Sequence, residues 1–155
     1  MKIRKALPED AGQICKMHRL TIQNVNSNDY PKNQITAWSK RSTPKWIRKI
    51  IENPDVYYYV ATENKKIIGF CDFDKEKLRG LYIHPKWIGK GVGKKLIKKA
   101  ESLAMKKGIK EFKTVSTLTA FKFYEKMGFK KVRKGKYRIG KTLIDVYYMK
   151  KKLGK

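Results

Sequence analysis

The spacing of apolar residues in the first third of the chain predicts a short strand followed by two helices. Ile3 lies in the strand. Residues 8–10, Pro-Glu-Asp, suit a first helical turn, and apolar positions recur at helical spacing over residues 11–22. A second helix is predicted over residues 44–52, because Thr43 is a good capping residue and is followed by proline.

Strand patterns then alternate with one long helix. Residues 56–62 and 67–74 are β-rich runs joined by a polar turn, so we expect an antiparallel hairpin. A further strand covers residues 77–85 and ends at its proline. After the glycines of residues 89–93, apolar residues form a helical stripe that closes at Gly108.

The last third predicts a strand over residues 111–117, a helix over residues 119–127 and two closing strands around Val132 and residues 143–149. The order strand, glycine loop, helix, strand forms a βαβ unit, whose strands should pair in parallel through a right-handed crossover. No repeat or linker interrupts the chain. We therefore expect an α/β (α+β) fold with a mixed sheet, in a single domain over residues 1–155.

Composition supports a folded protein with a strong positive charge. Hydrophobic residues make up 41% of the chain, which excludes a disordered polyelectrolyte, and the net charge is +26. Sixteen basic and nine acidic residues lie in residues 1–85, against twenty-three and four in residues 86–155. This charge favours anionic partners, although only seven of the basic residues are Arg and a lysine-coated surface explains it equally well.

The cysteines and the N-terminal sequence indicate in which cellular compartment the protein is expected. Cys15 and Cys71 are too few for a disulfide framework, and both lie among apolar neighbours, as buried thiols in a reducing cytosol do. The start lacks the apolar stretch of a signal peptide, and no run approaches the ~18 apolar residues of a membrane span. We expect a cytoplasmic protein with no membrane association.

The glycine loop of residues 88–96, IGKGVGKKL, is the sharpest chemical signal. Three glycines at alternating positions directly before a helix let backbone N–H groups approach an anion closely. Lys94 and Lys95 in the first helical turn oppose the helix dipole, which a bound phosphate would outweigh. The alternative is a plain tight turn with solvated lysines.

Other phosphate and metal sites fit less well. Lys95 occupies the place where a Walker loop needs Ser or Thr, and the third glycine of a dinucleotide fingerprint is missing. Cysteine and histidine do not gather at metal-ligand spacing, so we expect no metal. His18, on an apolar helix stripe, is expected to be a packed side chain.

Two separated segments carry a family resemblance. Residues 81–96, LYIHPKWIGKGVGKKL, and residues 119–129, TAFKFYEKMGF, are similar to the GCN5-related N-acetyltransferases (GNAT superfamily), which use acetyl-coenzyme A. The order of strands and helices extends the resemblance over essentially the whole chain. It implies an acyl-CoA N-acyltransferase fold with a mostly antiparallel central sheet, one parallel βαβ crossover and flanking helices.

The resemblance also implies where acetyl-coenzyme A binds. Its pantetheine arm would pair with a strand at Leu81, Tyr82 and Ile83, its pyrophosphate would lie on the loop Ile88, Gly89, Lys90, Gly91, Val92, Gly93 and Lys94, and Thr117 and Phe121 would lie near the arm. Two positions depart from the family pattern: the loop starts with Ile88 instead of Gln or Arg, and Thr117 replaces a frequent Asn. Main-chain contacts should preserve binding, while Thr117 or Ser116 could instead cap the helix.

The same resemblance assigns the chemistry. Tyr124 matches a tyrosine that points at the coenzyme sulfur in many relatives, although spacing alone makes it a core residue. A base should take a proton from the attacking amine, and Asp72 and Glu76 are the candidates, with Asp74 on the face of Asp72. Each could equally be a solvated charge.

The acceptor side is the least readable part of the sequence. Tyr30, Gln34 and Trp38 lie in a segment that flanks the open side of the cleft in similar proteins, and Tyr59 could line the pocket from the sheet. The alternative is a capped surface helix on which Trp38 packs inward.

We therefore expect an N-acetyltransferase that moves an acetyl group directly to a primary amine of a small molecule or a peptide, as a monomer or homodimer. The positive charge mildly disfavours polyamine acceptors. One alternative is a basic nucleic-acid-binding or ribosome-associated protein, and another is a non-catalytic coenzyme A binder of the same fold.

Overall fold

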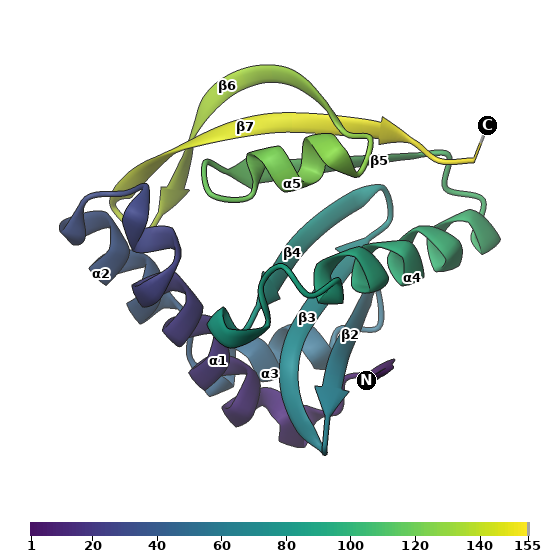
Figure 1. Cartoon of the computed structure of the whole chain (residues 1–155), viewed down its shortest axis with the longest axis horizontal. Coiled ribbons are helices and arrows are strands. Elements are labelled where there is room, and N and C mark those ends of the chain that lie inside the picture. Colours follow the sequence, from purple (N-terminus) through teal and green to yellow (C-terminus); the bar gives the residue numbers. More distant parts are fainter. Residues whose placement is uncertain (155) are drawn as a thin grey trace.

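A seven-stranded sheet forms the centre of the computed structural model, which describes residues 1–154 (Figure 1). The strand order is β1-β2-β3-β4-β5-β7-β6, and every neighbouring pair is antiparallel except β4 and β5. This confirms the predicted mixed sheet with one parallel crossover. The strands are β1 Lys2–Lys5, β2 Val56–Glu63, β3 Lys66–Asp74, β4 Lys77–Ile83, β5 Glu111–Thr117, β6 Lys130–Ile139 and β7 Thr142–Lys152.

Helices cover both faces of the sheet (Figure 1). The first three pack on one face, and α4 and α5 pack on the other, as their core clusters show. The helices are α1 Ala11–Asn24, α2 Lys32–Arg41, α3 Pro44–Glu52, α4 Val92–Lys106 and α5 Phe121–Lys126, with short 3-10 turns at Pro8–Asp10, Asn26–Asn28 and Pro85–Trp87. Among residues 1–154, none of these helices is both long and apolar enough to cross a membrane.

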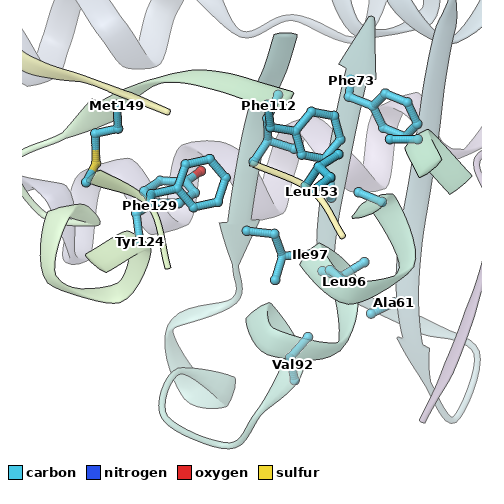
Figure 2. Packing of buried hydrophobic residues seen from close by; sticks show 14 of the residues in the cluster. Ala61, Phe73, Val92, Leu96, Ile97, Phe112, Tyr124, Phe129, Met149 and Leu153 are labelled. Atoms are coloured by element: carbon cyan, nitrogen blue, oxygen red, sulfur yellow. The ribbon is translucent and has the colours of Figure 1, made fainter. Parts of the chain in front are cut away.

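The apolar stripe of α4 becomes the largest core cluster. Leu96 and Ile97 are almost fully buried beneath Phe73 and Phe112, whose rings lie 5.3 Å apart in an edge-to-face contact (Figure 2). Aromatic pairs of this geometry stabilise a core beyond the area that they bury. The shared cluster connects α4 to both strands that flank β4, so the helix that follows the glycine loop is held firmly against the sheet.

A β-bulge in β4 separates it from β5. Asp72 of β3 pairs with Gly80, but the next residue of β3, Phe73, pairs with Leu78, so Arg79 is an extra residue in β4. Bulges bend a strand and increase its local twist. The parallel pairing with β5 stops at Leu78, directly before the bulge. Beyond that point the two strands diverge and leave a wedge (Figure 1).

The structure defines the local conformation of two segments for which the sequence left alternatives open. The segment containing Trp38 forms a helix with that indole packed inward, 2% exposed. The helix predicted over residues 119–127 is shorter, because the Thr117 hydroxyl accepts a hydrogen bond from the backbone N–H of Ala120 and holds a turn before α5 begins. Thr117 therefore holds the turn before α5 and does not cap the helix itself, whose N-cap is Ala120.

The cap of α3 gives a test of this description. The Thr43 hydroxyl accepts a hydrogen bond of 3.1 Å from the backbone N–H of Trp46. Thr43→Ala should lower the free energy of unfolding by about 1 kcal/mol in urea titrations. Thr36→Ala is the control, because Thr36 lies exposed inside α2 and its hydroxyl only adds a bond to the Lys32 carbonyl. An equal loss in both variants would contradict the capping role.

Candidate functional site

Unpaired backbone groups of β4 line the wedge. The backbone N–H of His84 donates to the Ile68 carbonyl, so the alternation of an antiparallel pair turns the main chain of Leu81 and Ile83 away from β3 and toward the gap. The Thr21 hydroxyl donates to the Ile83 carbonyl at 2.9 Å. The groups of Leu81 remain directed at the wedge, where an extended amide-containing ligand could pair with them.

The first cavity opens on the α4 and α5 face of the wedge. Its volume is about 380 Å³, and its walls come from β4, the glycine loop, the start of α4, the end of β5, α5 and the C-terminal end of α1 with the turn that follows it. The buried hydroxyl of Thr119 lines it without a hydrogen-bond partner among the described residues. A buried polar atom of this kind is costly unless a ligand or water completes it.

The glycine loop bounds this cavity with backbone that other residues would strain. Gly89 and Gly91 have φ of 79° and 84°, in the left-handed region, and Gly91 is the N-cap of α4. A Cβ at Gly93 would come within 3.2 Å of the Phe123 ring. Gly89, Gly91 and Gly93 all line the cavity at the N-terminus of a fifteen-residue helix. This arrangement suits a phosphate, since it combines free N–H groups with the positive end of a helix dipole.

The other predicted loop positions divide between cavity and core. Ile88 and Lys94 line the cavity. The ammonium of Lys90 lies 5.3 Å from the centre of the Trp87 ring, and the Val92 side chain is buried in the core. Phe121 stacks on Tyr147 with ring centroids 4.2 Å apart and is absent from the cavity wall.

Tyr124 is a buried residue that also lines the first cavity. Its ring is buried against Phe129, and it also lines the first cavity beside the wedge. Burial raises the pKa of its hydroxyl well above the usual value, with a further contribution from the nearby Cys71 thiol. The phenol is therefore neutral and able to donate a hydrogen bond across the physiological pH range.

A second cavity of about 1090 Å³ lies on the opposite face, beneath α1, α2 and α3. It meets the first cavity at the wedge, because Arg79, Gly80, Tyr82, Val115 and Thr117 line both. The sheet thus presents one opening to two cavities on opposite faces. Two reactants entering from opposite sides could meet there.

Asp72 projects into this second cavity next to the bulge. It is 4% exposed, and its carboxylate lies 3.7 Å from the Arg79 guanidinium. Burial raises the pKa of Asp72 to about 7, against the opposing effects of Arg79 and the backbone N–H of Gly80. A carboxyl that titrates near neutral pH can accept or release a proton during turnover.

Several predicted residues lie elsewhere. Glu76 is 59% exposed and pairs with Lys113 on the surface. Tyr59 lies beneath Lys99 of α4 and lines neither cavity. Tyr30 is buried, donates to the Asp145 carbonyl at 2.6 Å and accepts from the Leu118 N–H at 2.8 Å, so it holds β7 to the end of β5.

Of the remaining two residues predicted to bind the acceptor, one lines the second cavity. Gln34 is half-buried and lines neither cavity, whereas Trp38 lines the second cavity.

Sequence reasoning missed Arg79, Arg41 and Trp46, which all line the second cavity. Gly80 inside a strand pattern is a signal for a bulge, and it would have drawn attention to Arg79. Arg41 and Trp46 carry no comparable signal, because packing between α2, α3 and the sheet alone brings them to the cavity.

No cluster of three or more His, Cys, Asp or Glu residues within residues 1–154 has a geometry that would hold a metal ion. Both cysteines are buried free thiols.

Comparisons with known proteins agree with this geometry. A family model of the acetyltransferase (GNAT) domain matches residues 26–153. Spermidine N(1)-acetyltransferase of Thermoplasma acidophilum is 30% identical over 142 residues, covering 84% of this chain and 88% of that protein.

Two crystal structures share the fold. A GCN5-related N-acetyltransferase from Rhodopseudomonas palustris gives a TM-score of 0.92 at 24% identity, covering 98% of this chain and 95% of the other. PaiA N-acetyltransferase from Thermoplasma acidophilum, in complex with coenzyme A, gives a TM-score of 0.82 at 26% identity. The match covers 97% of this chain and 98% of that chain. The predicted fold class is confirmed.

The raised pKa of Asp72 predicts how stability depends on pH. Between the ordinary value of 3.8 and the folded value of about 7, the folded chain keeps a proton that the unfolded chain has lost. The free energy of unfolding should therefore fall as pH rises through this window. Asp72→Asn should remove that fall in urea titrations from pH 4 to 8, while Asp55→Asn, at an exposed position, should keep it. Parallel pH profiles for the wild type and Asp72→Asn would show that Asp72 is not the titrating group.

Proposed function

Since this chain belongs to the acetyltransferase (GNAT) family, we propose that residues 1–155 form one catalytic domain that transfers an acetyl group from acetyl-coenzyme A directly to a primary amine. The observation that carries the proposal is the wedge between β4 and β5, which joins the two cavities. One reactant in each cavity would place thioester and amine at the bulge. No covalent enzyme intermediate is needed.

The first cavity fits the coenzyme. Its glycine loop offers N–H groups at the start of α4 for a diphosphate, and Lys94 adds a positive charge. The free main-chain groups of Leu81 and the N–H of Ile83 can pair with the amides of a pantetheine arm. The related PaiA structure contains coenzyme A, which supports this assignment.

When bound, acetyl-coenzyme A supplies a thioester whose acetyl group passes to the amine nitrogen, with release of the free thiol. Tyr124 would donate its phenolic hydrogen to the departing sulfur from the wall of the first cavity. The backbone at Ile83 and the bulge would hold the carbonyl oxygen with N–H donors.

Asp72 is the base that the geometry favours. An alkyl amine is protonated below its pKa near ~10.4, so the enzyme must remove a proton before the nitrogen can attack. Asp72 is ionised above about pH 7, lies beside the bulge and faces the second cavity. Glu76 points into solvent and is poorly placed for the same task.

Two observations on the acceptor point in opposite directions. The name of the Thermoplasma relative suggests a polyamine. The charged residues of the second cavity, however, comprise three acidic against six basic side chains: Asp72, Asp74, Glu111, Arg41, Lys77, Arg79, Lys113, Arg133 and Lys150. This excess of positive charge repels a polycation.

The proposal is tested by following thiol release from acetyl-coenzyme A with a panel of primary amines. Turnover with at least one amine is expected, together with a higher melting temperature when acetyl-coenzyme A binds. Tyr124→Phe should lower kcat by about tenfold or more and keep this thermal shift, since the ring remains but the proton donor is lost. A shift without any turnover in the wild type would indicate a non-catalytic coenzyme A binder.

The base is tested by pH profiles of kcat. The wild-type rate should rise as pH passes about 7, where Asp72 ionises. Asp72→Asn should lower kcat by about 100-fold and remove this rise, leaving only the increase due to the amine itself. Glu76→Gln provides the comparison and should follow the wild type. A profile that changes in Glu76→Gln and not in Asp72→Asn would assign the base to Glu76.

A further inference from the structure

The second cavity collects most of the unsatisfied polar atoms of the molecule. Five buried side-chain polar atoms of residues 1–154 have no hydrogen-bond partner, and four of them belong to residues that line this cavity: His18 Nε2, Trp38 Nε1, Arg41 Nε and Asp74 Oδ1. Leaving such atoms unpaired costs stability, so buried polar groups are normally satisfied. Their concentration in one cavity indicates a site built for a polar ligand.

Hydrogen-bond donors gather at the end of the cavity formed by α1 and α2. Trp38 is 2% exposed, and its indole nitrogen, which can only donate, lies near the Tyr82 hydroxyl without forming a hydrogen bond. The Arg41 guanidinium lies 5.0 Å from the centre of the Trp46 ring and 5.8 Å from that of Tyr137. Within the part of the chain that the structure describes, no carboxylate forms a salt bridge with Arg41.

His18 lies beside this pair of donors. It is 3% exposed, its Nδ1 lies 2.9 Å from the Ser42 hydroxyl, and its ring contacts Tyr82 at 4.2 Å. Burial, together with the charges of Arg41 and Arg19, lowers the pKa of His18 to about 3. The imidazole is therefore neutral, and Arg41 provides the positive charge at this end of the cavity.

The carboxylates lie farther along the same strands. Asp72 is opposite Gly80, while Tyr82, which touches His18, is two residues farther along β4. Two residues of a strand span about 7 Å. The wall between these points is aromatic, with Phe70 stacked on Tyr82 at 5.5 Å. The cavity thus has a carboxylate at the wedge, an apolar stretch and an unpaired cation beyond it.

We propose that the acceptor is a primary amine that also carries an anionic oxygen group, a carboxylate or a phosphate, and that Arg41 with Trp38 binds this group while the amine lies at Asp72. The inference rests on the proposed function and adds the class of acceptor. A guanidinium held between aromatic rings is a strong partner for such anions, because its N–H groups match their oxygens. The excess of basic residues around the cavity attracts the same acceptors.

The test compares acceptors that differ only in charge. ω-Amino carboxylates with two to six methylene groups are assayed by thiol release against the corresponding ω-amino amides, which are neutral and nearly the same shape. At least one carboxylate should exceed its amide by about tenfold or more in kcat/KM, through a lower KM, since a charge-assisted hydrogen bond contributes roughly that much. Amino alkyl phosphates and the matching amino alcohols form a second arm, which distinguishes phosphate from carboxylate.

Variants then assign the preference to Arg41. Arg41→Gln should abolish the advantage of the anionic acceptors, so that the ratio of kcat/KM between each anionic acceptor and its neutral counterpart falls to about one. Arg48→Gln is the matched control, because Arg48 lies exposed on α3 and lines neither cavity. An unchanged melting-temperature shift with coenzyme A would show that Arg41→Gln is folded.

The outcomes separate this inference from the proposed function. If neutral amines are acetylated and no anionic acceptor exceeds its neutral counterpart, the inference is overturned and the acetyltransferase stands. If no amine supports thiol release, calorimetric titration of 6-aminohexanoate into the coenzyme A complex still decides it. Binding to the wild type that is lost in Arg41→Gln supports the anion site, and equal or absent binding in both overturns it.

Discussion

One extra residue in β4 determines the functional architecture of this protein. Arg79 interrupts the regular pairing of β4 with β3, and the parallel pairing of β4 with β5 ends at the residue before it. Strands that diverge inside a sheet leave main-chain donors and acceptors without partners, a condition that proteins normally avoid. Here the unpaired groups lie between two cavities, so the interruption creates a site at which an extended ligand can complete the sheet.

The two faces of the sheet carry different helices and different cavities. On one face, α4 is held against Phe73 and Phe112, and this fixes the glycine loop at its N-terminus. On the other face, α1, α2 and α3 enclose a larger, aromatic cavity. Because Gly80 and Tyr82 line both cavities, β4 is the boundary between them. A change in α2 or α3 can therefore alter the second cavity without changing a wall of the first.

Electrostatic effects in this protein depend on burial more than on the number of charges. The net charge is +26, and the edge strand β6 alone carries Lys130, Lys131, Arg133, Lys134, Lys136 and Arg138, all exposed. Exposed lysines on an edge strand also discourage pairing with other chains. In contrast, Asp72 titrates near neutral pH because its burial outweighs an Arg79 guanidinium only 3.7 Å away. Burial, and not the net charge, therefore determines the protonation of this carboxyl.

The sequence by itself determined most of the helices and strands and the glycine loop before α4, because both depend on local signals. Helix and strand periods, the cap at Thr43 and the three alternating glycines before α4 act over a few residues, and a family resemblance places Tyr124. Gly80 inside a strand pattern could have indicated the bulge, but the bulge was not recognised from the sequence.

Only the tertiary structure decided which residues line the second cavity. Three features depend on which faces of distant segments pack together: whether Asp72 or Glu76 is buried, whether Tyr59 faces a cavity, and whether Arg41 meets Trp46. Tyr30 shows the same limit: it lies in the expected segment, yet its hydroxyl is used to join β7 to the end of β5. Burial and partner choice are properties of the assembled layers, so no local pattern of residues specifies them.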